Sequence, residues 1–262
     1  MLTFVKLGGS LITDKRESQR FHADVMRRVA GEIARAHAAQ PESKLLIGHG
    51  SGSFGHVAAQ KHGTMNGVRT TAEWRGFAEV ATLARRLNSL VVENLYEAGL
   101  PVFAVQPSSS ARCEAGTLTA MDVAPVATAL DHGLIPVVYG DVAFDSRRGG
   151  TIISTETIFF YLAEQLHATR ILLLGEVEGV LDPDGKVIPH ITPVNLPDIE
   201  AALGGSGGMD VTGGMATKVR QMVELTEHLP ALQIRIFGGK QAGQIEAALL
   251  GQIAPGTLIT CV

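Results

Sequence analysis

Short apolar runs alternate with longer amphipathic stretches along this chain of 262 residues. The apolar runs predict buried strands at residues 2–7, 45–47, 102–105, 135–139, 170–174, 233–237 and 257–261. Helical spacing of apolar side chains predicts helices at residues 22–39, 123–131, 156–167, 197–203, 215–228 and 242–250, and one long or broken helix at 70–97. Residues 142–153 have the pattern of a hairpin. Strands that alternate with helices predict an α/β fold, a three-layer αβα sandwich with a mostly parallel sheet.

Glycines follow four of the predicted strands directly: Gly8 with Gly9, the turn at residues 48–55, Gly140 and Gly175. In parallel sheets ligands bind beyond the carboxyl ends of the strands, so these turns are expected at one common edge. The turn at 48–55 is the richest, with four glycines between a predicted strand and a predicted helix. Such an arrangement directs backbone N–H groups at an anion such as phosphate.

Composition narrows the class of protein. Apolar residues make up 45% of the chain, charged residues 18%, and the net charge is −4, which is ordinary for a soluble enzyme and gives no sign of a nucleic-acid-binding surface. Cys113 and Cys261 fit neither a metal site nor a disulfide framework, so we expect a reducing, cytoplasmic environment. The first apolar run is too short for a signal peptide, and no run approaches a membrane span.

Phosphoryl transfer needs cations around the transferred group and amides that hold its oxygens. Three lysines are candidates: Lys6 at the end of the first strand, Lys15 in the next turn and Lys218 at the start of a helix. Lys15 could equally be a solvated loop lysine. Neither glycine turn has the GxxxxGK[ST] spacing, and the HRD and DFG sequences of protein kinases are absent.

Two other interpretations of the 48–55 turn compete with phosphate transfer. Its glycines match GxGxxG, but Glu73, the acid at the distance a dinucleotide site needs, lies in a helical pattern. Among the interpretations of this glycine turn, dinucleotide binding therefore ranks a distant third. His56 could cap the turn structurally, but its place inside an anion-binding turn favours a phosphate ligand, whereas His49, nearer the strand, is expected to be structural.

Five segments appear in the order found in the amino-acid kinase superfamily: KLGGSLITDK at 6–15, GHGSGSFGH at 48–56, YGDVAFD at 139–145, TIISTE at 151–156 and DVTGGMATK at 210–218. Over nearly its whole length the chain resembles this superfamily, and within it the isopentenyl phosphate kinase branch. The histidine that closes GSFGH points to that branch, because branches that act on carboxylates or carbamate lack it. By the same criterion the fosfomycin kinase type is the nearest alternative.

The resemblance implies an amino-acid kinase fold and ATP-dependent conversion of isopentenyl phosphate into isopentenyl diphosphate, a step of isoprenoid biosynthesis by the alternative mevalonate pathway. Mg²⁺ would arrive bound to ATP rather than in a protein cage, so no metal ligands are assigned. A homodimer and no membrane or nucleic-acid partner are expected. Residues 1–262 would form a single domain, with acceptor binding in about 1–150 and nucleotide binding in about 151–262.

On the donor side, the resemblance assigns the phosphates of ATP to Lys6, Gly8, Gly9, Ser10 and Lys218. Lys15 would stabilise the transferring group, and Glu156 would orient the lysines. The nucleotide would be bordered by Glu176, Leu181 and Gly214. The pair Gly175-Glu176 departs from the Thr-Asp usual at this point of the family.

On the acceptor side, the amides of Ser51 and Gly52 would hold acceptor and donor oxygens, His56 would bind the acceptor phosphate, and Gly140 would touch the substrate. Ser51 stands where the family often has glycine, which is tolerable if the turn keeps its amides. Two alternatives stay open: a kinase of fosfomycin or another small phosphate or phosphonate, and a non-catalytic nucleotide-sensing domain. Retention of all three lysines speaks against the second.

Overall fold

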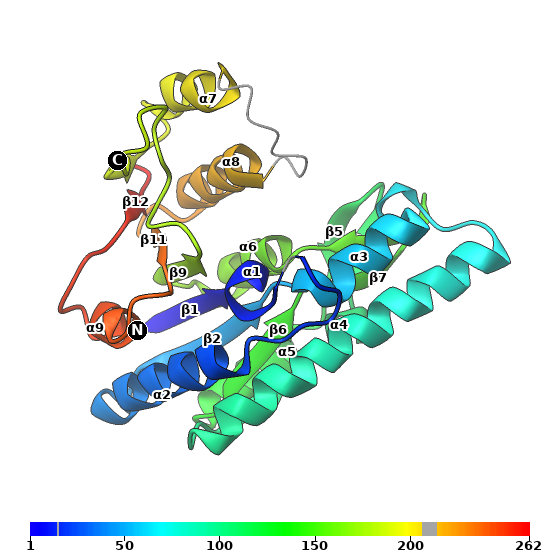
Figure 1. Ribbon diagram of the computed structural model, residues 1–262, viewed down its shortest axis with the longest axis horizontal. Helices are drawn as coiled ribbons and strands as arrows, with labels where there is room; N and C mark the ends of the chain where they lie inside the picture. Colours follow the sequence, from blue (N-terminus) through cyan, green and yellow to red (C-terminus); the bar gives the residue numbers. More distant parts are fainter. Residues whose placement is uncertain (15, 206–213) are drawn as a thin grey trace.

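The computed structural model describes residues 1–14, 16–205 and 214–262 (Figure 1). In these residues eight strands form one sheet, in the order β10-β12-β11-β9-β1-β2-β6-β3. Neighbouring strands are parallel except β11 and β12, so the mostly parallel sheet predicted from the sequence is confirmed. The strands are β1 Leu2–Leu7, β2 Lys44–His49, β3 Val102–Ala104, β6 Ile135–Tyr139, β9 Arg170–Gly175, β10 His190–Ile191, β11 Gln233–Gly238 and β12 Thr257–Ile259.

Helices cover both faces of this sheet. Successive strand residues point to opposite sides, and apolar residues on both sides are buried against helices. On β1, Phe4 packs in a core with α5, α6 and α8, and Val5 packs in a second core with α2, α4 and α9. The result is the predicted three-layer αβα sandwich (Figure 1). The helices are α2 Ala23–Ala39, α4 Thr71–Glu97, α5 Ala124–Asp131, α6 Thr155–Leu166, α7 Leu196–Gly205, α8 Gly214–His228 and α9 Gln244–Leu249.

A second, smaller sheet continues from β6, in the order β5-β4-β7-β8. It is packed against α3 (Gly52–His62) and α4 through a small apolar cluster that includes Ala58, Phe77, Val80 and Val142. Figure 1 shows this sheet beside α3 and the N-terminal part of α4. Its strands are β4 Arg112–Glu114, β5 Thr117–Ala120, β7 Asp141–Asp145 and β8 Gly149–Ile153.

Helix α4 is unbroken, which is one of the two alternatives expected for residues 70–97, and a capping box between Thr70 and Glu73 fixes its start. Other local features differ from the sequence-based expectations. Helix α3 begins at Gly52, inside the glycine turn rather than after it. The short strands β4 and β5 and the four-residue helix α1 (Gly9–Ile12) were not predicted.

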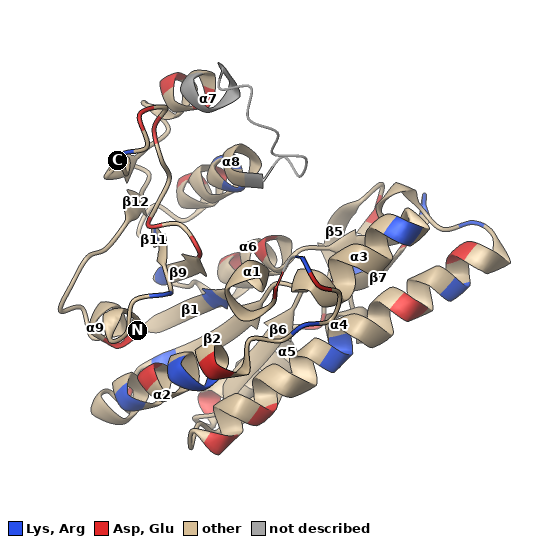
Figure 2. Cartoon of the chain, in the orientation of Figure 1, with Lys and Arg blue, Asp and Glu red and all other residues tan. Residues whose placement is uncertain are grey.

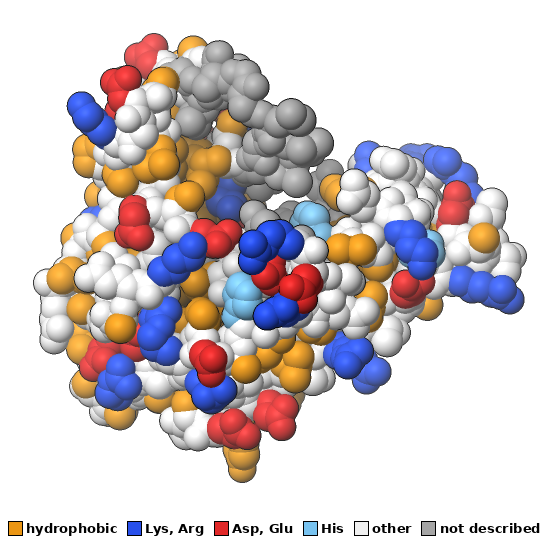
Figure 3. Space-filling view, in the orientation of Figure 1, with side chains coloured by type: hydrophobic (Ala, Val, Ile, Leu, Met, Phe, Trp, Pro, Cys, Tyr) orange, Lys and Arg blue, Asp and Glu red, His pale blue; other side chains and the backbone are white. Residues whose placement is uncertain are grey.

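Charged side chains of both signs are interspersed along α2 and α4 and over the face seen in Figures 2 and 3. This face therefore has no extended basic field of the kind that nucleic acids require. Among the described helices, none combines the length and the apolar character that crossing a membrane requires.

Candidate active site

Two glycine turns lie directly against each other at the carboxyl edge of the sheet. The first joins β1 to α1, and the second joins β2 to α3. A Cβ atom at Gly9 would lie 2.6 Å from the amide nitrogen of Gly52, and one at Gly50 would lie 2.9 Å from the amide nitrogen of Gly9. Real Cβ atoms do not approach this closely, so glycine is needed for the backbones to touch.

The same contact leaves a set of backbone amides without protein acceptors. In the part of the chain that the structure describes, no hydrogen bond to protein is made by the amides of Gly9, Ser10, Ser51 and Gly52. They begin α1 and α3, where helix geometry leaves N–H groups unpaired and favours negative charge. Amides from both turns are therefore available to oxyanions at one place.

Lys6, Glu156 and Lys218 form an ion cluster close to these turns. The Oε1 atom of Glu156 lies 2.7 Å from Lys6 Nζ and 3.4 Å from Lys218 Nζ. Glu156 stands in the first turn of α6, whose start is fixed by a hydrogen bond from the Thr157 amide to the Ser154 hydroxyl. Two cations around one carboxylate leave an excess positive charge, which suits an incoming phosphate.

Lys6 and Glu156 are largely buried, whereas Lys218 is partly exposed, and burial competes with the charges in setting the pKa values of Lys6 and Glu156. Burial raises the pKa of Glu156, but Lys6 and Lys218 outweigh it and lower that pKa to about 2. Burial is also the main influence on Lys6, where it lowers the pKa, and the attraction of Glu156 offsets only part of this effect. Glu156 is thus an ionised carboxylate that keeps charge on a buried lysine.

We expect the acid stability of the protein to depend on Glu156. The pKa of Glu156 in the folded protein is about 2, below the ordinary value of 4.5. Ionisation of Glu156 therefore stabilises the fold fully above pH 4.5, and this stabilisation is lost as the pH falls through the folded pKa. Urea unfolding of the wild type and Glu156→Gln should therefore give a difference in unfolding free energy that narrows between these two pH values. A difference that does not change with pH would contradict the assignment.

His49 and His56 occupy opposite environments on the second turn. His49 is fully buried, with Nδ1 3.1 Å from the Gly50 carbonyl oxygen and Nε2 3.0 Å from Asn88 Oδ1, and it stacks on Tyr139. Its burial lowers its pKa, and the expectation that it is structural is confirmed. His56 lies on α3 with an exposed side chain, two residues before Ala58 of the apolar cluster.

Ser51 keeps the turn intact although it carries a side chain. Its φ is −71° and its ψ −12°, values that any residue adopts, and its side chain lies over Gly55, where a Cβ would come within 2.7 Å of it. Gly52 differs, because its φ is +49°. The serine is therefore compatible with the free amides of the turn, as expected.

The other candidate residues lie around this centre. Gly140 follows β6 and donates its amide to the His49 carbonyl oxygen at 3.2 Å. Glu176 follows β9 and pairs with Lys240 at 3.1 Å, and Leu181 bridges to Val187. Gly8 lies against β9, where its Cβ would meet the Leu174 carbonyl. Gly214 begins α8, and Lys15 and residues 206–213 lie outside the described residues.

Two residues of this region were missed by the sequence analysis. Lys240 comes two residues after Gly238, the last residue of β11, so the same strand–glycine signal that marked the other turns could have revealed it. Thr13, whose hydroxyl contacts both glycine turns, carries no local signal, because its partner Ser53 is 40 residues away.

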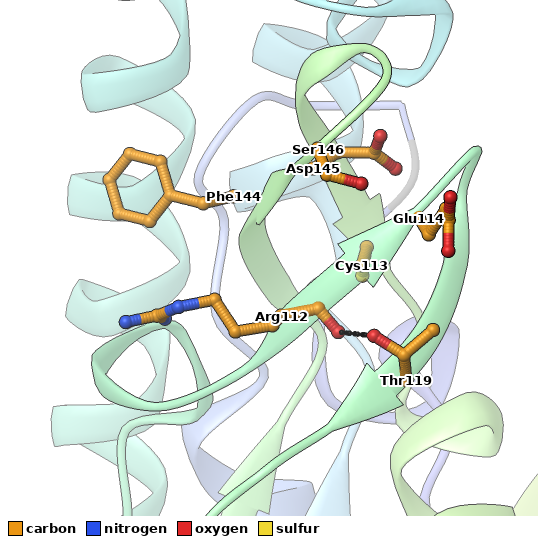
Figure 4. A pocket seen from close by; sticks show the side chains of 7 residues that line it. All are labelled: Arg112, Cys113, Glu114, Thr119, Phe144, Asp145 and Ser146. Atoms are coloured by element: carbon orange, nitrogen blue, oxygen red, sulfur yellow. Dashed lines mark hydrogen bonds between the residues drawn. The ribbon is translucent and has the colours of Figure 1, made fainter.

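A pocket of about 310 Å³ lies elsewhere, on the small sheet (Figure 4). Its polar groups are already engaged: both Asp145 oxygens accept backbone amides, including those of Ala115 and Gly116, and Thr119 donates to the Arg112 carbonyl. Burial raises the pKa of the Cys113 thiol to about 11, so it is not a reactive thiolate. This pocket is not the site of the lysine chemistry. Within residues 1–14, 16–205 and 214–262 no cluster of acidic, histidine or cysteine residues could hold a metal ion.

An αβα sandwich with unpaired amides from two turns and a lysine–glutamate–lysine cluster at the sheet edge defines a class of phosphoryl-transfer enzymes. The model of the amino acid kinase family matches residues 1–238, and the chain belongs to this family. The chain is 35% identical to the isopentenyl phosphate kinase of Methanothermobacter thermautotrophicus, with 99% of both chains covered. It is 38% identical to that of Haloferax volcanii, with 98% of both covered. A crystal structure of an isopentenyl phosphate kinase superposes with a TM-score of 0.85 at 30% identity, covering 99% of this chain and 100% of the other.

Proposed function

We propose that this protein transfers the γ-phosphoryl group of ATP to the phosphate of isopentenyl phosphate, and so forms isopentenyl diphosphate for isoprenoid biosynthesis. The observation that carries the proposal is the contact of the two glycine turns beside the Lys6–Glu156–Lys218 cluster. Full-length similarity to isopentenyl phosphate kinases supports the choice of acceptor.

The donor phosphates are assigned to the first turn. Lys6 and Lys218 would neutralise the β- and γ-phosphates, the amides of Gly9 and Ser10 would hold their oxygens, and Gly8 permits the backbone approach. Mg²⁺ would enter with ATP. Beyond the cluster, Glu176, Leu181 and Gly214 are assigned to the border of the nucleotide, with Lys240 as the ionic partner of Glu176.

The acceptor is assigned to the second turn. The amides of Ser51 and Gly52 and the side chain of His56 would hold the acceptor phosphate, with Gly140 beside the substrate. An anionic acceptor oxygen attacks the γ-phosphorus in line, a new P–O bond forms, and the bond to ADP breaks. Since the attacking oxygen is already anionic, no general base is required, and Lys15 would stabilise the transferring group.

The choice between isopentenyl phosphate and a small polar acceptor rests on similarity rather than on a visible pocket wall. Apolar residues between α3, α4 and the small sheet, among them Ala58, Phe77, Val80 and Val142, are buried against one another as core. Ala58 follows His56 by two residues and points to a different face of α3 from the exposed His56 side chain. Full-length similarity to isopentenyl phosphate kinases therefore supports the isoprenoid over fosfomycin or a similar phosphonate.

A coupled assay of ADP release tests the proposal on a panel of isopentenyl phosphate, other short phosphates and fosfomycin. We expect isopentenyl phosphate to be turned over with the highest kcat/KM. Turnover of fosfomycin without turnover of isopentenyl phosphate would overturn the proposal in favour of the phosphonate kinase. Calorimetry that finds ATP binding, with no turnover of any acceptor, would point instead to a nucleotide-sensing domain.

His56→Ala is expected to raise the KM for isopentenyl phosphate by about 10-fold or more, because it removes one hydrogen bond to a charged group. The KM for ATP should change by less than about threefold. Steady-state kinetics with each substrate varied in turn provide the measurement. Gln60→Ala, which truncates another exposed side chain of α3, is the control and should leave both constants unchanged. Equal losses for both substrates would argue against the assignment.

We also propose that the enzyme is a cytoplasmic homodimer. Both cysteines are free thiols, which fits a reducing compartment. β3 ends the eight-stranded sheet at one edge, and Phe103 on this strand and Tyr96 near the end of α4 are 43% and 72% exposed. An edge strand with exposed aromatic side chains supports pairing with a second copy.

A further inference from the structure

Thr13 connects the two glycine turns through a single hydroxyl group. Its Oγ1 donates to the carbonyl oxygen of Gly9 at 2.7 Å, and it accepts a hydrogen bond from the amide of Ser53 at 3.0 Å. Gly9 belongs to the turn after β1, and Ser53 to the first turn of α3. Thr13 itself is fully buried. One hydroxyl is thus both donor and acceptor between segments 40 residues apart.

The hydroxyl also acts as a cap for α3 that comes from another segment. Within the described part of the chain, Ser51, the N-cap residue of α3, makes no side-chain capping hydrogen bond. Thr13 satisfies the Ser53 amide instead, and the Ser51 and Gly52 amides remain available in the described part of the chain. The helix start is therefore stabilised without a side chain that occupies the anion site.

Close packing fixes the spacing as well as the hydrogen bonds. The position that a Cβ of Gly52 would take overlaps the Thr13 hydroxyl oxygen, and the Thr13 Cγ2 methyl group lies 2.8 Å from it. Thr13 thus lies directly against the backbone of Gly52, whose amide is one of the free donors. A shift of Thr13 would move the second turn relative to the first.

We propose that Thr13 is a positioning residue that holds the donor turn and the acceptor turn at the separation needed for in-line phosphoryl transfer. The proposal rests on the proposed function of the two turns. Thr13 touches no phosphate in this scheme and acts only through Gly9, Gly52 and Ser53. Each substrate would still bind its own turn without the hydroxyl, but the two phosphates would meet less well aligned.

Thr13→Val and Thr13→Ser separate this role from simple packing. Valine keeps the shape and removes the hydroxyl, whereas serine keeps the hydroxyl and removes the methyl group. We expect Thr13→Val to lower kcat by about 10- to 100-fold, because misplacement of reacting groups by about 1 Å has effects of that order. The KM for ATP and for the acceptor should each change by less than about threefold. Thr13→Ser should stay within about threefold of the wild-type kcat.

Controls exclude a loss of folded protein as the cause. Rates are normalised to the ATP-binding stoichiometry from calorimetry, which should remain that of the wild type in Thr13→Val. Thr64→Val makes the same change at another buried threonine, whose hydroxyl has no hydrogen-bond partner among the described residues. It should leave kcat unchanged.

Two outcomes would overturn the proposal: a normalised kcat of Thr13→Val within threefold of that of Thr13→Ser, or an increase in one KM that accounts for the whole loss. Failure of the proposed function is recognised separately. If the wild type uses another phosphate acceptor and not isopentenyl phosphate, the same variants are compared on that acceptor. The role of Thr13 then stands or falls on its own result.

Discussion

Replacement of Glu156 by glutamine is expected to lower kcat by about 10²- to 10³-fold, the range seen when one preorganised electrostatic group is lost. Glutamine keeps the shape of the side chain and removes the negative charge between Lys6 and Lys218. Without that charge, burial would lower the pKa of Lys6 further and favour its neutral form. A neutral lysine cannot stabilise the charge that spreads over the transferring phosphoryl group.

The pH profile distinguishes this explanation from a loss of packing. If the variant fails because Lys6 loses its proton, the alkaline decline in its activity should begin at a lower pH than in the wild type. Lowering the pH should then recover part of its rate. Rates of ADP release over the neutral and alkaline range provide the measurement. Urea unfolding should show a loss of roughly 3 kcal/mol, as for a buried ion pair that loses one partner.

Glu164→Gln is the matched control for this variant. It makes the same change on the same helix α6, at a carboxylate that pairs with His228 on the surface. Exposed pairs of this kind contribute about 0–1 kcal/mol, so kcat should not change. A Glu156→Gln enzyme with nearly wild-type kcat would contradict the role assigned to the cluster.

The sheet and its glycine turns could be predicted because both depend on neighbours in sequence. The apolar run at residues 2–7 became β1 with the same bounds, and glycines that follow strands marked the edge where the site lies. The site contacts could not be derived in this way. Lys6 and Glu156 are 150 residues apart, and only the fold brings them to 2.7 Å. Their pairing was expected from family resemblance alone.

Short elements in loops escaped prediction for a different reason. β4 and β5 span three and four residues and are mostly exposed, so each is too short for an alternating pattern to stand out in the sequence. The start of α3 was placed too late because Gly52 has a low helix propensity, yet it is the first residue of the helix. Tertiary contact with Gly9 and Thr13 requires glycine there, and this requirement overrides propensity.

Gly52→Ala tests that requirement and is expected to lower both stability and turnover. At a φ of +49° a non-glycine residue adds about 1–2 kcal/mol of strain, and a Cβ would also overlap the Thr13 hydroxyl. Overpacking of this kind adds about 1–3 kcal/mol, so urea unfolding should show a loss of about 2–5 kcal/mol in unfolding free energy. Moving Gly52 away from Gly9 would also separate the two sets of amides, and kcat should fall by about 10²-fold or more.

Gly31→Ala is the control, and it should change the unfolding free energy in the opposite direction. Gly31 lies inside α2, and the nearest atom to its Cβ position is the end of the flexible Arg35 side chain, at 3.4 Å. Alanine there should raise the unfolding free energy by about 0.5–1 kcal/mol and leave kcat unchanged. If both alanines proved harmless to kcat, the contact between the two glycine turns would not be what aligns the phosphates, and the explanation of Thr13 would fail with it. If Gly52→Ala alone removes activity while binding ATP normally, the second turn acts on alignment rather than on the nucleotide.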